Sequence, residues 1–203
     1  MKTVLPSFVF PPISYFFNLA ENAELIIDLG DHYHKQTYRN RYKIMAANGL
    51  LNLSIPVESY KNHTALKDIK IAYSENWQKL HWRSIFSAYQ SSPFFQYYDY
   101  QFEPFFTKNE KYLIDFQQKS LTLILKLLKL KAEISYSENY IEKTETIVDL
   151  RNNFSAKAEN ETLKFPVYQQ VFSEKFPFEK DLSVLDLLFN LGPESLTYLK
   201  SIK

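Results

Sequence analysis

The 203-residue sequence contains no cysteine and only three glycines, Gly30, Gly49 and Gly192. Without cysteine the chain cannot form disulfides, thiolate zinc sites, iron–sulfur clusters or a cysteine nucleophile. The three scattered glycines exclude a GxGxxG fingerprint and a Walker-type phosphate loop, because both motifs place glycines close together. Any chemistry must therefore rest on other side chains and other backbone arrangements.

A strong net charge and a long apolar run are also missing. The chain has 24 Lys and Arg residues and 23 Asp and Glu residues. The resulting net charge of +1 does not indicate extensive electrostatic binding to duplex nucleic acid. Prolines interrupt the apolar N-terminus, and Lys126 and Lys129 interrupt the apolar stretch 121–130. We therefore expect a cytoplasmic protein without a membrane span, and we do not expect nucleic acid as its partner.

Apolar and aromatic residues are abundant instead. Hydrophobic residues make up 45% of the chain and aromatic residues 17%, with 15 tyrosines and 17 phenylalanines. A chain of this length and composition is expected to fold as a single domain over residues 1–203. Because a buried tyrosine needs a partner for its hydroxyl, part of this surplus is expected to line a pocket or an interface.

Hydrophobic periodicity predicts strands that alternate with helices. The Asn48–Gly49 pair between two alternating segments predicts an early β-hairpin over 42–57. The other predicted strands are 3–10, 24–29, 69–72, 133–137 and an extended 167–172, and the predicted helices are 13–19, 74–89, 109–130 and 183–192. The aromatic stretch 94–106 is expected to be irregular or one helical turn. We therefore predict a single three-layer-like α/β domain with a mixed sheet and a helical C-terminal half.

The densest polar block runs from Asp28 to Arg41, directly after the predicted strand 24–29. Open α/β sheets place ligands at the carboxyl ends of their strands, which is where this block begins. Arg39 and Arg41 offer forked donors for phosphate or carboxylate, and Asp28 or His32 has the chemistry of an acid or base. The alternative is a polar connection whose cations pair with nearby aspartates. No third metal ligand is identified beside the histidines, so no metal is expected.

A second block, 77–85, combines large aromatic residues with cations. On a helix, Trp77 and His81 share one face while Lys79 and Arg83 share another, which suits the binding of a sugar or a base. The alternative is that the aromatic residues are core and the cations are solvated. The aromatic run 94–106 is typical of packing or a homodimer surface, and no cofactor is expected.

Several motifs in combination resemble the WbqC-like protein family. They are LPSFVFPPISYF (5–16), KQTYRNR (35–41), NG (48–49), LSIPV (53–57), NWQ (76–78), HWRS (81–84), YQSSPF (89–94), YQQVF (168–172) and LSVLDLLFNLGP (182–193). Many members have Gln where this chain has Leu5, and the segment 138–163 is shorter than in the fuller members. The resemblance spans nearly the whole chain.

The resemblance implies a transferase of bacterial surface-polysaccharide (O-antigen) biosynthesis that adds an amino acid, such as glycine, to an amino sugar. Its partner would be an anionic small molecule, either a nucleotide sugar or an activated acyl donor. On the matching positions, the catalytic residues are Asp28, His32 and His81, and the substrate-binding residues are Lys35, Arg39, Asn40, Arg41, Trp77 and Arg83.

The alternative function is a non-catalytic binding or scaffold protein that uses the tyrosine-rich surface at 97–106, in a homodimer or with another partner. The enzyme interpretation predicts that the charged site residues converge on one concave pocket. The scaffold interpretation predicts that they are scattered and that the aromatic surface is exposed.

Overall fold

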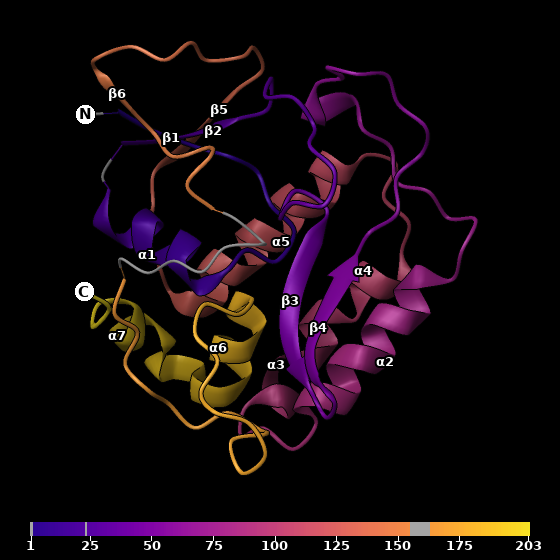
Figure 1. Ribbon diagram of the computed structural model, residues 1–203, viewed down its shortest axis with the longest axis vertical. Helices are drawn as coiled ribbons and strands as arrows, with labels where there is room; N and C mark the ends of the chain where they lie inside the picture. The colour runs from indigo at the N-terminus through magenta and orange to yellow at the C-terminus, as the bar shows by residue number, and fades with distance from the viewer. Residues whose placement is uncertain (1, 23, 155–162) are drawn as a thin grey trace.

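A parallel sheet and an antiparallel hairpin form two separate sheets in this protein (Figure 1). The computed structural model describes residues 2–22, 24–154 and 163–203. The four-stranded sheet has the order β5-β2-β1-β6, and its pairings are all parallel. Its strands are β1 (Lys2–Leu5), β2 (Glu24–Asp28), β5 (Ile134–Ser137) and β6 (Ile147–Asp149).

The first strand is shorter than predicted because a tight turn follows it. β1 ends at Leu5, and the chain then runs irregularly to α1 (Ile13–Glu21). Phe10 in this turn has a φ of 40°, a conformation that a bulky residue rarely adopts. Pro11 and Pro12 cannot continue a strand ladder, and Pro12 precedes the first turn of α1, which proline tolerates. The hydroxyl of Tyr15 then donates to the carbonyl of Pro6 at 2.9 Å and fixes the helix beneath the sheet.

A long insertion connects β2 to β5. It contains the hairpin strands β3 (Arg41–Ala46) and β4 (Gly49–Ser54), the 3₁₀ turn η1 (Leu66–Asp68) and the helices α2 (Trp77–Tyr89), α3 (Phe95–Phe102), α4 (Pro104–Thr107) and α5 (Leu113–Leu128). α5 lies in the centre of the molecule, and α2 runs beside the hairpin (Figure 1). The apolar face of α5, including Phe116 and Ile124, is buried, as its helical spacing predicts.

The predicted hairpin is confirmed, with a turn of a different kind from the one that Asn-Gly usually forms. Ala46 pairs with Gly49, so Ala47 and Asn48 occupy the turn. Gly49 has a φ of 107°, whereas Asn48 is not among the described residues with a positive φ. A type I′ turn needs positive φ at both central residues. The glycine therefore serves the first position of the returning strand.

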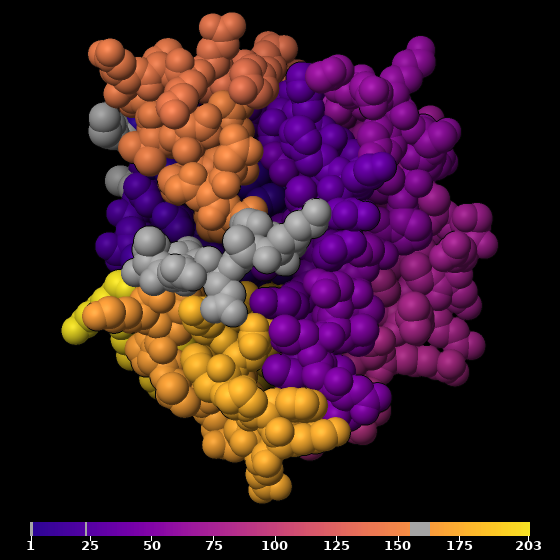
Figure 2. Space-filling view, in the orientation of Figure 1, coloured from indigo at the N-terminus to yellow at the C-terminus, as the bar shows by residue number. Residues whose placement is uncertain are grey.

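The C-terminal helices pack on the N-terminal turn. α6 (Val184–Leu191) begins after Ser183, whose hydroxyl accepts from the amide of Leu185 at 3.4 Å and donates to the carbonyl of Phe10 at 3.0 Å. Gly192 ends α6 with a φ of 51°, and η2 (Gly192–Glu194) and α7 (Ser195–Leu199) follow. α6 therefore lies within the predicted helix 183–192, with Ser183 as its N-cap and Gly192 as its C-cap. In Figure 2 the orange and gold segments occupy one side of the molecule, and the purple and magenta insertion occupies the other.

The α/β class, the early hairpin and the helical C-terminal half are confirmed. Two local predictions were wrong: residues 69–72 form only the isolated bridges Val57↔Ile71 and Lys70↔Tyr112, and 94–106 contains the helices α3 and α4. Residues 167–172, predicted as a strand or an extended segment, contain no strand. β6 was not predicted, because its three residues lie in the weakly periodic segment 138–162. No helix within the described ranges is both long and apolar enough to cross a membrane.

Candidate functional site

The carboxyl edge of the parallel sheet holds a buried ion network around Arg151. This residue follows β6 and donates to Asp28 Oδ2 at 2.6 Å and to the carboxylate of Asp149 at 2.7 and 3.0 Å. The side chains of Arg151 and Asp28 are 4% and 0% exposed. Asp28 also accepts from the backbone amides of Gly30 and Ile141 at 2.9 and 3.1 Å. A carboxylate with three donors is poorly placed to accept a proton from a substrate.

The connection between β5 and β6 completes this edge. It uses only residues 138–146 to pass from one edge strand to the other, although such crossovers usually take a dozen residues or more. The ring of Tyr140 lies 4.4 Å from the guanidinium carbon of Arg151. The connection also passes directly over Gly30, where an added Cβ would lie 2.2 Å from the Tyr140 amide nitrogen. Hydrogen bonds from Arg151 lower the pKa of Asp149, and the same bonds raise the pKa of Arg151.

A second buried ion pair joins Arg39 to Asp31 in the segment after β2. Arg39 is 4% exposed, and its backbone carbonyl accepts from Gln117 Nε2 on α5 at 2.5 Å. The pair therefore anchors the segment against α5, which agrees with the interpretation of local pairing between cations and aspartates. Asp31 contacts Nη2 of this guanidinium, and its Nε is buried without a hydrogen-bond partner among the described residues.

The imidazoles near this edge lie closer to the surface. His32 is half-buried, and its ring centroid lies 5.1 Å from that of His63 and 6.2 Å from that of Tyr140. Burial and nearby Arg39 lower the pKa of His34. Lys35 is exposed. The described ranges contain no group of three His, Asp or Glu side chains placed to hold a metal ion.

A cavity of about 250 Å³ lies between β4 and the amino end of α2. Its wall includes Trp77 and His81 from α2 and the polar residues Asn52 and Ser54 from β4. The indole N–H of Trp77 is buried and has no hydrogen-bond partner among the described residues. The side chain of the N-cap residue Asn76 makes no capping hydrogen bond. The backbone amides in the first turn of α2 therefore receive no hydrogen bond from their cap residue. The cavity therefore adjoins several N–H donors and the positive end of a helix dipole.

Arg41 lies beside this cavity on β3. It pairs in register with Ser54, and its Nε donates to the Ser54 hydroxyl at 3.0 Å. Arg41 is half-buried, yet within the described part of the chain no carboxylate lies within ion-pairing distance of its guanidinium. Asn40 precedes it and fixes the base of the hairpin by donating to the Ile55 carbonyl at 2.9 Å. Among the predicted arginines, Arg41 thus combines partial burial with an uncompensated charge.

His81 is held on both sides of its ring. Nδ1 lies 3.0 Å from the hydroxyl of Tyr42, and the indole of Trp77 contacts the ring, with centroids 5.0 Å apart. Burial lowers the pKa of His81 to about 4, and the nearby backbone of Ser54 acts in the opposite direction. The imidazole is therefore neutral at physiological pH and is a weak base.

The predicted site residues separate into groups and do not converge. Asp28, His32 and Arg39 lie at or after the carboxyl edge, whereas Trp77 and His81 line the cavity. Arg41 contacts Ser54 in the cavity wall, Asn40 contacts the Ile55 carbonyl at the base of the hairpin, and Lys35 and Arg83 are exposed. The physical reason is that Arg151 and Asp31 neutralise the charges that the sequence offered for a ligand. The expectation of one pocket shared by all of these side chains is not met.

Sequence reasoning missed Arg151, Tyr42 and Ser54. Arg151 lies in a segment without clear periodicity, so no local signal placed it opposite Asp28. The predicted turn at Asn48–Gly49 would set Arg41 opposite Pro56, whereas the observed turn at Ala47 and Asn48 sets it opposite Ser54.

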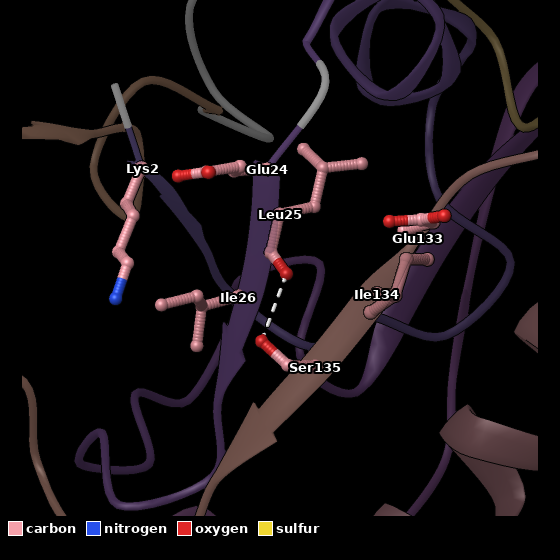
Figure 3. A pocket seen from close by; sticks show the side chains of 7 residues that line it. All are labelled: Lys2, Glu24, Leu25, Ile26, Glu133, Ile134 and Ser135. Atoms are coloured by element: carbon pink, nitrogen blue, oxygen red, sulfur yellow. Dashed lines mark hydrogen bonds between the residues drawn. The ribbon is translucent and has the colours of Figure 1, made fainter.

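Another cavity, of about 340 Å³, opens at the amino ends of the strands (Figure 3). It is lined by Lys2, Glu24, Leu25, Ile26, Glu133, Ile134 and Ser135. The Ser135 hydroxyl donates to the Leu25 carbonyl at 3.1 Å, which occupies its proton within the sheet. Ligands of open parallel sheets bind at the opposite, carboxyl edge, so this cavity is not the candidate site.

The chain belongs to the WbqC-like protein family, whose model matches residues 6–160. A relative in Mycobacterium tuberculosis (strain ATCC 25618 / H37Rv), the uncharacterized protein Rv1507c, is 25% identical over 223 residues. The similarity covers 97% of this chain and 96% of that protein. No solved structure matches the chain.

Proposed function

We propose that this WbqC-like protein binds the negatively charged end of a small metabolite in the cavity between β4 and α2. The proposed role is group transfer in bacterial surface-polysaccharide biosynthesis, in keeping with the family. One observation carries the proposal: Arg41 is half-buried beside the cavity and is held by a hydroxyl, with no carboxylate partner in the described ranges. A partly buried charge is stable only when it is paired or well hydrogen-bonded, so an anion is its natural complement.

The remaining donors favour the same class of ligand. The amino end of α2 directs its amides and the positive end of its dipole toward the cavity region, and the Trp77 N–H lies in the wall. Backbone amides at a helix start bind phosphate and carboxylate groups well. A neutral sugar would use hydroxyl-to-amide bonds but would leave the charge of Arg41 without a partner.

The volume of the cavity limits what it can enclose. Pockets that enclose a whole drug-sized ligand measure about 300–1,000 Å³. At about 250 Å³ this cavity holds one end of a nucleotide sugar or of an activated acyl donor, with the rest of the ligand on the surface.

Transfer of an acyl group to an amino sugar requires a base. The amine nitrogen forms a bond to the acyl carbon, the bond to the leaving group breaks with its electron pair, and the amine proton passes to the base. Asp28 is saturated by donors and His81 is a weak base, so neither suits this step. Glu75 is the exposed carboxylate in the cavity wall, and we assign the base to it.

Tryptophan fluorescence tests the binding proposal. The chain has two tryptophans, so Trp82→Phe leaves Trp77 in the cavity wall as the reporter. Titrations use inorganic phosphate, acetyl phosphate and UDP-glucose, which separate a bare anion from an acyl donor and a nucleotide sugar. At least one probe is expected to change the Trp77 emission with saturation. Arg41→Ala is expected to weaken that probe about 10- to 100-fold, because a hydrogen bond to a charged group contributes about 1.5–3 kcal/mol.

Arg83→Ala is the matched control, because it removes an exposed arginine from the outer face of α2. It should leave both emission and affinity unchanged. Equal affinities for wild type and Arg41→Ala, or the absence of any response to the three probes, would overturn the proposal.

The second candidate function is a non-catalytic binding protein, and exposed aromatic residues favour it. Tyr97 and Tyr100 on α3 are 58% and 66% exposed. Phe86 on α2 is also exposed, and its ring centroid lies 5.7 Å from that of Phe95 at the start of α3. Sedimentation of wild type and of Tyr97→Ser/Tyr100→Ser tests self-association through this surface. A smaller mass for the double variant supports it, whereas a monomeric wild type excludes the homodimer.

A further inference from the structure

A groove at the carboxyl end of α5 has an apolar floor and a cationic rim. It has a volume of about 370 Å³, and its floor and rim are formed by Leu125, Leu130, Ala132, Lys126, Lys129 and Lys131. We propose that this lysine groove binds the surface of a membrane that contains anionic phospholipids. The contact is peripheral: the lysines meet the lipid head groups, and the floor meets the first methylene groups below them.

The backbone forms the groove at the point where α5 ends. Lys129 ends the helix with a φ of 54°, and its amide donates to the Lys126 carbonyl at 3.1 Å. The amide of Leu130 donates to the Leu125 carbonyl at 3.0 Å. Two bonds of this kind form the turn that closes many helices. The turn brings residues 130–132 back beside the last turn of α5, and the two segments line the groove together.

The floor of the groove is aliphatic and only partly covered. Leu125, Leu130 and Ala132 pack against the core, yet each of them is only half-buried. The described residues that line the groove include no aromatic ring and no carboxylate. Single-stranded nucleic acids are bound by aromatic stacking, which this floor does not offer. An aliphatic floor fits lipid methylene groups instead.

The rim carries positive charge that the protein does not neutralise. Lys126, Lys129 and Lys131 are exposed, and none of them has an ion-pair partner among the described residues. No Asp or Glu occurs between Asp115 and Glu133 in the sequence. The negative end of the helix dipole amounts to about half of one charge, so it offsets only part of the charge of the rim. The groove is therefore a local positive patch on a chain whose net charge is only +1.

An anionic bilayer fits this combination better than a soluble anion does. A soluble phosphate or carboxylate is bound best by forked donors in a fixed geometry, whereas exposed lysines act as separate point charges. Near an anionic membrane, each of these charges is attracted to the negative surface. The aliphatic stems of the lysines extend the floor while their ammonium groups reach the head groups. An apolar face bordered by lysines is typical of segments that lie in the membrane interface.

The lysine groove is distant from the proposed anion cavity between β4 and α2. Phe116 in the first turn of α5 has its ring centroid 6.2 Å from that of Trp77, which lines the cavity. The groove lies at the other end of the same helix, and a helix of 16 residues is about 24 Å long. Membrane binding and ligand binding can therefore be measured separately, and either can fail without the other.

Vesicle flotation tests membrane binding with the full chain. Wild type is expected to float with vesicles of equimolar phosphatidylglycerol and phosphatidylcholine, and not with vesicles of phosphatidylcholine alone. Lys126→Gln/Lys129→Gln/Lys131→Gln is expected to weaken the partition about 100-fold, because each lysine near an anionic membrane contributes about fivefold. If wild type does not float, or if the variant floats equally well, the groove is not a membrane-binding surface.

A matched control removes three other exposed lysines that have no ion-pair partner among the described residues, in the variant Lys61→Gln/Lys79→Gln/Lys108→Gln. Both triple variants lose three positive charges. The control is expected to float within about threefold of wild type, because charges farther than a Debye length from the membrane are screened. Equal losses in both variants would show that net charge, and not the groove, drives binding. Both urea midpoints should match that of wild type, since substitutions of exposed side chains seldom change stability.

Hydrogen exchange of wild type locates the contact without any variant. Anionic vesicles are expected to slow exchange at residues 126–132, and protection confined to other segments would contradict the assignment. Two soluble competitors, glycerol phosphate and polyglutamate, are expected to leave the protein on the vesicles. Release by glycerol phosphate would identify a soluble anion as the ligand, and release by polyglutamate would identify an acidic protein. Either release would overturn the assignment to a bilayer.

Discussion

The carboxyl edge of the parallel sheet and the cavity between β4 and α2 both gather arginine, yet they use it in opposite ways. At the edge, Arg39 and Arg151 are buried against aspartates. Beside the cavity, Arg41 is held by the hydroxyl of Ser54 and has no carboxylate partner in the described ranges. The partner of each guanidinium, and not its residue type, thus separates a structural charge from one that is available to a ligand.

The energies of the two regions differ for the same reason. A buried ion pair repays the cost of desolvation only while both partners are present. Loss of one partner at the edge leaves an unpaired buried charge, whereas loss of Arg41 leaves only a serine hydroxyl near the surface. The edge should therefore govern stability, and the cavity should govern binding.

The largest expected effect comes from breaking the edge at Arg151. Arg151→Met leaves Asp28 completely buried without its cation, which should lower the free energy of unfolding by about 3–5 kcal/mol. Urea unfolding measures this change. Arg83→Ala should stay within about 0.5 kcal/mol of wild type, and Asp28→Asn should restore part of the stability of Arg151→Met. An unchanged urea midpoint for Arg151→Met would show that the network does not stabilise the sheet.

A smaller decrease in the free energy of unfolding is expected at acidic pH, through His81 in the cavity wall. The pKa of His81 falls from its ordinary 6.5 to about 4 on folding, so stability is present above pH 6.5 and is lost as the pH falls toward 4. This shift corresponds to about 3 kcal/mol. His34 acts in the same direction, while burial raises the pKa of Asp186 and opposes the loss. Urea unfolding of wild type and His81→Gln across this range isolates the contribution of His81, and parallel curves would contradict it.

The smallest of the three effects tests how closely the β5–β6 connection covers the edge. Gly30→Ala would place a Cβ 2.2 Å from the backbone nitrogen of Tyr140, so the connection must move away. We expect a loss of about 1–3 kcal/mol in urea unfolding, as for other overpacked sites. Gly49→Ala is a useful comparison, because open space surrounds that position but its φ of 107° strains any side chain. Faster hydrogen exchange at Ile141 in Gly30→Ala alone would place the damage at the edge.

Local pattern predicted much of the fold. The α1 helix, β2, the hairpin, α2, α5 and β5 all lie where periodicity and turn residues indicated, and Ser183 caps α6 as its side chain suggested. These elements have short-range causes: apolar spacing, a capping hydroxyl or a turn glycine. The aromatic helices α3 and α4 were missed because large aromatic side chains mask helical spacing, and tertiary packing decides their conformation.

The candidate site was less accessible to sequence reasoning. Of the residues that the sequence singled out, Trp77 and His81 lie in the wall of the cavity, and Arg41 contacts Ser54 in that wall. Local spacing could not show which residues pair with Asp28 and Arg39. Arg151 lies 123 positions from Asp28 in the sequence, and no local pattern predicts a contact over such a separation.

The sequence by itself determined the α/β class, the presence of the hairpin, and the chemistry excluded by the absence of cysteine. These properties follow from residue type and from spacing along a short length of chain. Only the tertiary structure decided which guanidinium is neutralised and which imidazole is buried. Pairing and desolvation depend on neighbours brought together by folding, and the energy of a charge depends on those neighbours more than on its own side chain.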